Sequence, residues 1–170
     1  MKFFKEKTAI IVCPSSLIYT IQSEIIRWAE FREEDVFAVS KSGDFALKKN
    51  QVKWANHKIL IVSYGMVASA KVRSKYILPR KYKLMACDEA HAIKNFKSAR
   101  FKAVQEIGKT CEGILLMSGT PFNFSSELFS TLQLLPRGIR LFPRFFNYKS
   151  EPDDSFAWRY CKPVQVFHQW

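Results

Sequence analysis

The sequence predicts an α/β protein built on a parallel β-sheet with helices on both faces. Five short apolar runs rich in β-branched residues recur over the first 117 positions, and helical patterns lie between several of them. The runs are continuous rather than alternating, which is typical of strands covered on both faces. Strands that alternate with helices favour a parallel sheet with right-handed crossovers, in which ligands bind beyond the carboxyl ends of the strands.

Each predicted strand is one of these apolar runs. In chain order they read TAIIVC, VFAV, KILIVS, KLMAC and GILLM, at residues 8–13, 36–39, 58–63, 83–87 and 113–117. Polar stretches follow three of them directly: CPSS after the first, DEAH after the fourth and SGTP after the fifth. We therefore expect these three stretches to lie at the same edge of the sheet.

Three helices are predicted from the spacing of apolar residues. The first follows Ser15 and Ser16, either of which can cap it. The second runs from about Ser98 to Lys109, and the third begins at Ser125. The apolar faces are Leu17, Ile21, Ile25 and Trp28 in the first helix, Phe101, Val104 and Ile107 in the second, and Leu128, Leu132 and Leu135 in the third.

Length and composition limit the class of protein. A chain of 170 residues with 48% hydrophobic content can bury one sizeable core, as a single domain or as one lobe of a larger enzyme. The apolar run at its start is too short for a signal peptide or a membrane span, so no membrane partner is expected. We expect residues 1–135 to form the lobe and residues 136–170, which are aromatic and rich in proline, to form an irregular extension.

The four cysteines are expected to be buried, reduced thiols. They are far apart and form neither a CxxC pair nor a cluster with histidine at the spacing of metal ligands. They are Cys13, Cys87, Cys111 and Cys161.

The net charge of +12 is unevenly distributed. From Phe45 to Cys87 the chain has no acidic residue, and four further basic residues follow the DEAH stretch, so the region from 45 to 102 could face DNA phosphates. A solvated basic face is an equally good explanation on charge alone. The ten basic residues of the acid-free segment are Lys48, Lys49, Lys53, Lys58, Lys71, Arg73, Lys75, Arg80, Lys81 and Lys83.

Asp88 and Glu89 stand side by side immediately after the strand at 83–87. An ordinary surface turn is one explanation, and a magnesium nucleotide site is the other. Phosphoryl transfer from ATP needs one carboxylate for Mg²⁺ and one for the attacking water. The hypothesis is that Asp88 reaches the magnesium shell, Glu89 polarises the water, and His91 links the nucleotide to a neighbouring segment.

Three stretches in one order resemble a known family: IIVCPSSLIYTIQSEIIRW, MACDEAHAIKN and LLMSGTPFNFSSELFSTL. They are similar to the first RecA-like lobe of the Swi/Snf-type ATP-dependent DNA translocases of helicase superfamily 2, and the resemblance runs from about Thr8 to Leu135. CPSSL followed by RW, SYGMV before the tetrad, and RYC near the end look most like the annealing-helicase branch, which remodels stalled replication forks.

The resemblance implies roles for individual residues. For each serine and threonine among them, a plain helix cap or turn is the alternative. The resemblance implies two DNA-facing segments: a loop that holds a DNA strand by its phosphates, at Pro14, Ser15 and Ser16, and a second segment at Ser63 and Tyr64. It implies a nucleotide motif at Asp88, Glu89 and His91, which continues into a DNA contact at Lys94 and Asn95. The segment that couples nucleotide state to DNA grip corresponds to Ser118, Gly119 and Thr120.

The chain departs from the family pattern in two places. A glycine-rich phosphate loop ending in Gly-Lys-Thr or Gly-Lys-Ser should precede the strand at 8–13, where none of the seven residues is glycine, so the RecA-like sheet is expected to be incomplete on its N-terminal side. The Gly-Lys-Thr at 108–110 comes after the tetrad and has Ala103 where the loop needs glycine, so we interpret Lys109 as a basic residue near a helix C-terminus. FNFSS is also one residue shorter than the family spacing.

We therefore expect part of the ATP-binding lobe of a nuclear DNA-dependent ATPase that uses ATP and Mg²⁺. It would act on duplex or forked DNA in fork remodelling, DNA repair or chromatin remodelling. Without the phosphate loop and the second RecA-like lobe, the polypeptide is expected not to turn over ATP. The alternative is a non-catalytic nucleic-acid-binding or interaction domain derived from such a motor.

Overall fold

A computed structural model describes residues 8–29, 31–119 and 125–134. Its centre is a five-stranded sheet in the order β2-β3-β1-β4-β5, and every neighbouring pair is parallel. The predicted parallel α/β fold is confirmed, and each predicted strand is found within one residue of its expected bounds. The strands are β1 Ala9–Cys13, β2 Val36–Val39, β3 Ile59–Ser63, β4 Leu84–Cys87 and β5 Gly113–Leu116.

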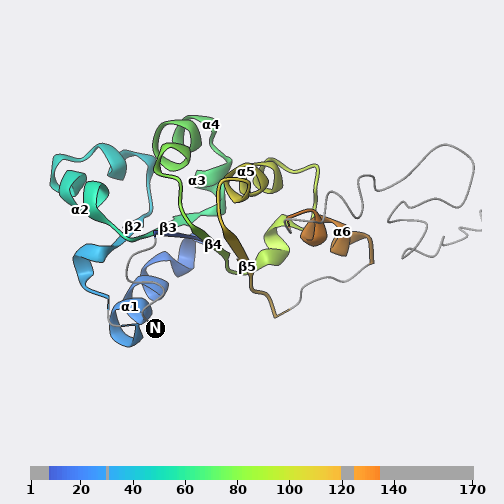
Figure 1. Cartoon of the computed structure of the whole chain (residues 1–170), viewed down its shortest axis with the longest axis horizontal. Coiled ribbons are helices and arrows are strands. Elements are labelled where there is room, and N and C mark those ends of the chain that lie inside the picture. The colour runs from blue at the N-terminus through green and yellow to red at the C-terminus, as the bar shows by residue number, and fades with distance from the viewer. Residues whose placement is uncertain (1–7, 30, 120–124, 135–170) are drawn as a thin grey trace, which may run out of the picture.

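Helices cover the sheet on both faces (Figure 1). One helix, α1, packs on one face against β2 and β3, whereas α2 to α5 lie on the other. The predicted second and third helices correspond to α5 and α6. The bounds are α1 Ile18–Trp28, α2 Gln51–Asn56, α3 Tyr64–Ala68, α4 Ala70–Val72, α5 Ala99–Gly108 and α6 Ser125–Leu134.

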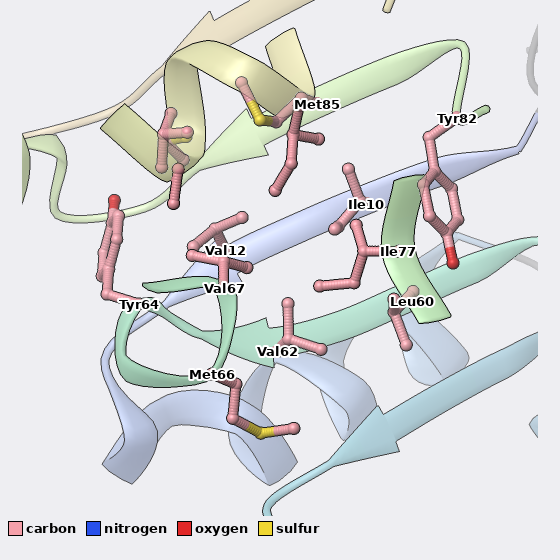
Figure 2. Packing of buried hydrophobic residues seen from close by; sticks show 14 of the residues in the cluster. Ile10, Val12, Leu60, Val62, Tyr64, Met66, Val67, Ile77, Tyr82 and Met85 are labelled. Atoms are coloured by element: carbon pink, nitrogen blue, oxygen red, sulfur yellow. The ribbon is translucent and has the colours of Figure 1, made fainter. Parts of the chain in front are cut away.

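Alternate residues of the central strands supply two cores. Ile10 and Val12 of β1 point to the face of α3 and α5, where they join Leu60, Val62 and Met85 (Figure 2). The other residues of the same strands, with Ile18 of α1, form a smaller cluster on the opposite face. Because both faces are covered, the central strands read in the sequence as unbroken apolar runs.

The start of α1 differs from the prediction. Ser15 and Ser16 do not cap it, because a 3₁₀ turn over Ser15–Leu17 comes first and Leu17 takes the N-cap position without a side-chain bond. Within α1, Ile18 is buried and Ile21 and Ile25 pack beside it as predicted, whereas Trp28, predicted on the same face, is 66% exposed. In α5, by contrast, Ser98 is the cap and accepts a hydrogen bond from the N–H of Phe101 at 3.2 Å.

The outer strands differ in how their edges are protected. Beside β2, the Gln22 side chain donates to the Val36 carbonyl at 3.2 Å and Asp44 accepts from the Ser40 N–H at 3.1 Å. Such side-chain bonds occupy an edge that could otherwise pair with another chain. On β5, Leu115 is 49% exposed.

Three cysteines are described, and all three are free thiols. Cys13 and Cys87 are buried at the ends of β1 and β4. Burial raises the pKa of Cys13 to about 11, with a smaller contribution from Asp88, and that of Cys87 to about 12. These two thiols are therefore protonated and unreactive near neutral pH, as predicted, whereas Cys161 lies outside the described residues.

A buried histidine holds an aromatic cluster together at the amino end of the sheet. His57 is 1% exposed, its Nδ1 lies 2.7 Å from the Trp54 carbonyl and its Nε2 lies 2.8 Å from the Tyr82 hydroxyl. A carbonyl can only accept, so Nδ1 carries the proton and Nε2 accepts from Tyr82. Burial, assisted by the positive charge of Arg80, lowers the pKa of His57 to about 4.

This pKa predicts an acid-sensitive fold. An unfolded histidine titrates near pH 6.5, so between about pH 6.5 and 4 the unfolded chain binds a proton that the folded chain excludes. The free energy of unfolding should be highest above pH 6.5 and fall by about 3 kcal/mol by pH 4. Urea unfolding at stepped pH measures this slope. His57→Gln should remove most of it, and the exposed His91→Gln should not; equal slopes in all three proteins would contradict the assignment.

Candidate functional site

The polar stretches predicted to meet do lie at one edge of the sheet. Because β1, β3, β4 and β5 belong to one parallel sheet, the residues that follow their carboxyl ends emerge on the same side (Figure 1). Open parallel sheets bind ligands at this edge. The stretches are Pro14–Ser16 after β1, Ser63–Gly65 at the end of β3, Asp88–His91 after β4 and Met117–Gly119 after β5.

The turn after β4 is held in an unusual backbone conformation. The Asp88 N–H continues the sheet by donating to the Val12 carbonyl at 2.8 Å. Glu89 then adopts φ 50° and ψ 53°, in the left-handed region. The next N–H, that of Ala90, donates to the Met117 carbonyl at 2.9 Å, which joins the turn to the segment after β5. The turn thus redirects the chain so that both carboxylates stand at the edge.

The two carboxylates have different surroundings. Asp88 has no hydrogen bond or ion pair from its carboxylate to any other described residue, whereas Glu89 pairs with His91, Oε2 to Nδ1, at 3.1 Å. The same Nδ1 lies 3.4 Å from the Ser118 hydroxyl. His91 therefore contacts both the acidic turn and the segment after β5.

The continuation of this turn is anchored by α6. The Ser130 hydroxyl, buried in α6, donates to the Lys94 carbonyl. Phe96 and Phe129 pack edge to face with ring centroids 5.3 Å apart. The Asn95 carboxamide oxygen accepts from the Lys97 N–H at 2.9 Å and so forms a local turn. Sequence reasoning missed the Ser130 contact, because the predicted apolar face of this helix was Leu128, Leu132 and Leu135, whereas its buried residues are Phe129, Ser130, Gln133 and Leu134.

The two DNA-facing segments differ in what they expose. Ser15 and Ser16 are exposed and form no cap bond. Ser63 is buried, and its hydroxyl caps α3 by accepting from the Met66 N–H at 3.2 Å. Tyr64 is 3% exposed, and its hydroxyl donates to the Asp88 carbonyl at 2.8 Å. A ligand at this second segment would therefore meet the backbone and the exposed Gly65, not these two side chains.

The segment after β5 is described only as far as Gly119. Ser118 contacts His91, and Gly119 is exposed with open space where a Cβ would stand. Thr120, the last of the three residues predicted to couple nucleotide state to DNA grip, lies outside the described residues.

The acid-free basic segment is partly neutralised in space. Four of its residues pair with acids from other parts of the chain: Lys53 with Glu33, Lys58 with Asp35, Arg73 with Glu106 and Lys83 with Glu112. Lys58 and Lys83 directly precede β3 and β4, so they lie at the amino edge, opposite the acidic turn. Within the region from 45 to 102 that was predicted to face DNA, these paired residues therefore have less charge available for phosphates.

The residues at the edge fit a magnesium ion that is held by one protein carboxylate and mainly by waters and substrate phosphates. Within the described part of the chain, no three His, Cys, Asp or Glu side chains are grouped as a metal site. One unpartnered carboxylate, that of Asp88, suits Mg²⁺, which usually takes one or two protein carboxylates together with waters and substrate phosphates.

The Gly-Lys-Thr at 108–110 is a helix end, as predicted. Lys109 is the C-cap of α5, and the Thr110 hydroxyl donates back to the Ile107 carbonyl at 2.7 Å. Gly108 is buried, and a Cβ there would stand 2.7 Å from the Ile114 side chain. This stretch packs against β5 and does not form a phosphate loop.

The fold and this edge define the chain as a RecA-like lobe of the helicase-core type. Two solved structures share the fold. The Sulfolobus solfataricus SWI2/SNF2 ATPase core in complex with dsDNA has a TM-score of 0.58 and 24% identity, and the match covers 78% of this chain and 26% of that one. The Pyrococcus furiosus Hef helicase domain has a TM-score of 0.61 and 13% identity, and the match covers 77% of this chain and 27% of that one. Residues 2–153 match the SNF2-related domain, and the chain belongs to that family.

Named relatives come from several parts of this family. The chain is 31% identical to Switch 2 of Arabidopsis thaliana over 84% of its length, 33% identical to the DNA repair and recombination protein RAD54 of rice over 78%, and 27% identical to the human DNA annealing helicase and endonuclease ZRANB3 over 94%. It spans only about 14–16% of the length of these relatives. No helix among the described residues is long and apolar enough to cross a membrane.

The serine contacts predict different effects on stability. Ser63→Ala removes the cap of α3 and should lower the free energy of unfolding by about 1 kcal/mol. Ser15→Ala removes no bond and should change it by less than about 0.5 kcal/mol. Urea unfolding of both variants measures the difference, and an equal loss in the two would show that Ser15 is also a cap.

Proposed function

We propose that this chain is part of the ATP-binding lobe of a DNA-dependent ATPase and DNA translocase. It would act in the nucleus in fork remodelling, DNA repair or chromatin remodelling, and a second RecA-like lobe would complete its site. The observation that carries the proposal is the meeting, at one edge of a RecA-like sheet, of an acidic turn, the His91 contact to Ser118 and exposed serines after β1.

In this proposal the two carboxylates divide the chemistry. Asp88 holds Mg²⁺, directly or through water, because its carboxylate has no other described partner. Mg²⁺ would bridge and neutralise the phosphates of ATP. Glu89 orients the attacking water, and His91, which already contacts both Glu89 and Ser118, relays the state of the nucleotide to Ser118, Gly119 and Thr120.

DNA would be held through its phosphates at the same edge. Ser15 and Ser16 offer exposed hydroxyls at the start of the 3₁₀ turn before α1. The backbone N–H groups at the start of a helical turn can bind an anion such as a DNA phosphate. The segment Ser63–Gly65 would contribute backbone groups, while Lys94 and Asn95, exposed beyond the acidic turn, would add a second contact.

We assign the annealing-helicase branch within this proposal. The alignment with the human annealing helicase runs along more of the chain than those with Switch 2 or RAD54. The stretches CPSSL, SYGMV and RYC favour the same branch.

The 170-residue polypeptide by itself is proposed not to turn over ATP. Its single Gly-Lys-Thr stretch is the end of α5, where Gly108 is packed against Ile114, so no cradle for the β and γ phosphates is present among the described residues. This same observation supports the second candidate, a non-catalytic nucleic-acid-binding domain derived from such a motor.

DNA binding tests the proposed edge directly. Ser16→Asp adds a negative charge at the phosphate contact and should weaken binding to a fluorescent duplex by about tenfold at low salt. Ser74→Asp adds the same charge at an exposed position in the helical segment Arg73–Ile77, which follows α4, and should change binding by less than about threefold. Anisotropy titrations at several salt concentrations measure both, and equal weakening by the two variants would contradict the site.

Millimolar MgATP then separates the two candidates. For the ATPase lobe, MgATP should change duplex affinity by at least about threefold, and Asp88→Asn should abolish that change. DNA affinity that depends steeply on salt and not at all on MgATP would favour the binding domain instead.

A further inference from the structure

We propose that Tyr64 is a positioning residue, whose buried hydroxyl holds the backbone of Glu89 in place and links the second DNA-facing segment to the acidic turn. The inference rests on the proposed function only for the role of Glu89 in orienting the attacking water. The geometry itself concerns two segments 24 residues apart in the sequence, joined by one hydrogen bond.

Glu89 needs outside support for its conformation. It is one of two non-glycine residues with positive φ among the described residues, and the other, Lys81, lies in an exposed turn. The left-handed conformation costs a residue with a Cβ roughly 1–2 kcal/mol. A residue keeps such a conformation when contacts around it over-determine the backbone.

Those contacts fix the peptide groups on both sides of Glu89. On the preceding side, the Asp88 carbonyl accepts from the Tyr64 hydroxyl at 2.8 Å. On the following side, the Ala90 N–H donates to Met117 and the Glu89 carbonyl accepts from Ala92, both at 2.9 Å. With both peptide planes held, rotation about the Glu89 backbone is restricted, and so is the direction in which its carboxylate leaves the chain.

Tyr64 is itself firmly placed. It opens α3, whose first turn is closed by the Ser63 cap, and its ring packs in the main core near Val12 and Val67, with the hydroxyl directed at the loop beyond β4 (Figure 2). Burial raises the pKa of Tyr64 well above its usual value, so the hydroxyl remains a donor. The hydroxyl therefore moves only when the start of α3 moves.

A coupling follows from this arrangement. A phosphate that binds at Gly65 and displaces the start of α3 would carry the Tyr64 hydroxyl with it and change the restraint on the peptide before Glu89. A DNA contact after β3 would in this way alter the direction of a carboxylate after β4. The exposed Gly65 forms the DNA side of this link, and Asp88 forms the nucleotide side in the proposed function.

Amide hydrogen exchange of the free chain, followed residue by residue by NMR, tests the positioning role. Tyr64→Phe keeps the ring and removes the hydroxyl, and it should speed exchange of the Ala90 and Ala92 amides by about tenfold. Tyr82→Phe is the matched control, since it also removes a buried hydroxyl, one that bonds His57, and it should leave these two amides unchanged. Equal acceleration in both variants, or none in Tyr64→Phe, would overturn the role.

The coupling has its own readout. Duplex DNA should change exchange at Ala90 in the wild type and not in Tyr64→Phe, when each protein is compared at a DNA concentration that saturates it. A DNA-dependent change that persists in Tyr64→Phe would overturn the link. If the wild-type chain does not bind DNA, the proposed function fails, whereas the exchange result for the free chain still decides whether Tyr64 positions Glu89.

Discussion

The parallel direction of all five strands is the constraint on which this structure depends. It sends every strand out at the same edge, so stretches as distant in sequence as Ser15 and Ser118 lie at one edge of the sheet. The acidic turn lies between the ends of β1 and β5 on that edge because β4 lies between these two strands. Its backbone is joined to both neighbours, through the Asp88 bond to Val12 and the Ala90 bond to Met117.

The two edges of the sheet have opposite electrostatic character as a result. At the amino edge, basic residues such as Lys58 and Lys83 are paired with acids, and His57 is kept neutral inside an aromatic cluster. These groups stabilise the fold and have little charge left for a ligand. At the carboxyl edge, Asp88 has no described partner for its carboxylate, and Ser15 and Ser16 are exposed. A charged ligand at the carboxyl edge therefore finds a carboxylate and hydroxyls that are still available for binding.

Much of the fold was predictable because it depends on local pattern. Unbroken apolar runs identified all five strands, and apolar spacing placed the second helix from about Ser98, the residue that caps α5. Features that depend on three-dimensional neighbours were not predictable. Trp28 at the end of α1 is exposed although its spacing suggested burial, and the acids that neutralise the basic segment come from distant elements. Tyr64 was predicted to face DNA, but its burial and its bond to Asp88 follow only from the packing of α3 against the sheet.

The measurement that tests the account most directly is an NMR titration of the chain with a short DNA duplex, following backbone amide shifts. The account predicts that the amides of Ser15, Ser16 and Gly65 at the carboxyl edge shift with a common affinity that weakens steeply as salt increases. Amides at the amino edge, such as those of Lys58 and Lys83, should not shift. Shifts concentrated at the amino edge, or spread evenly over all basic surfaces, would contradict the claim that this edge of the sheet is the functional site.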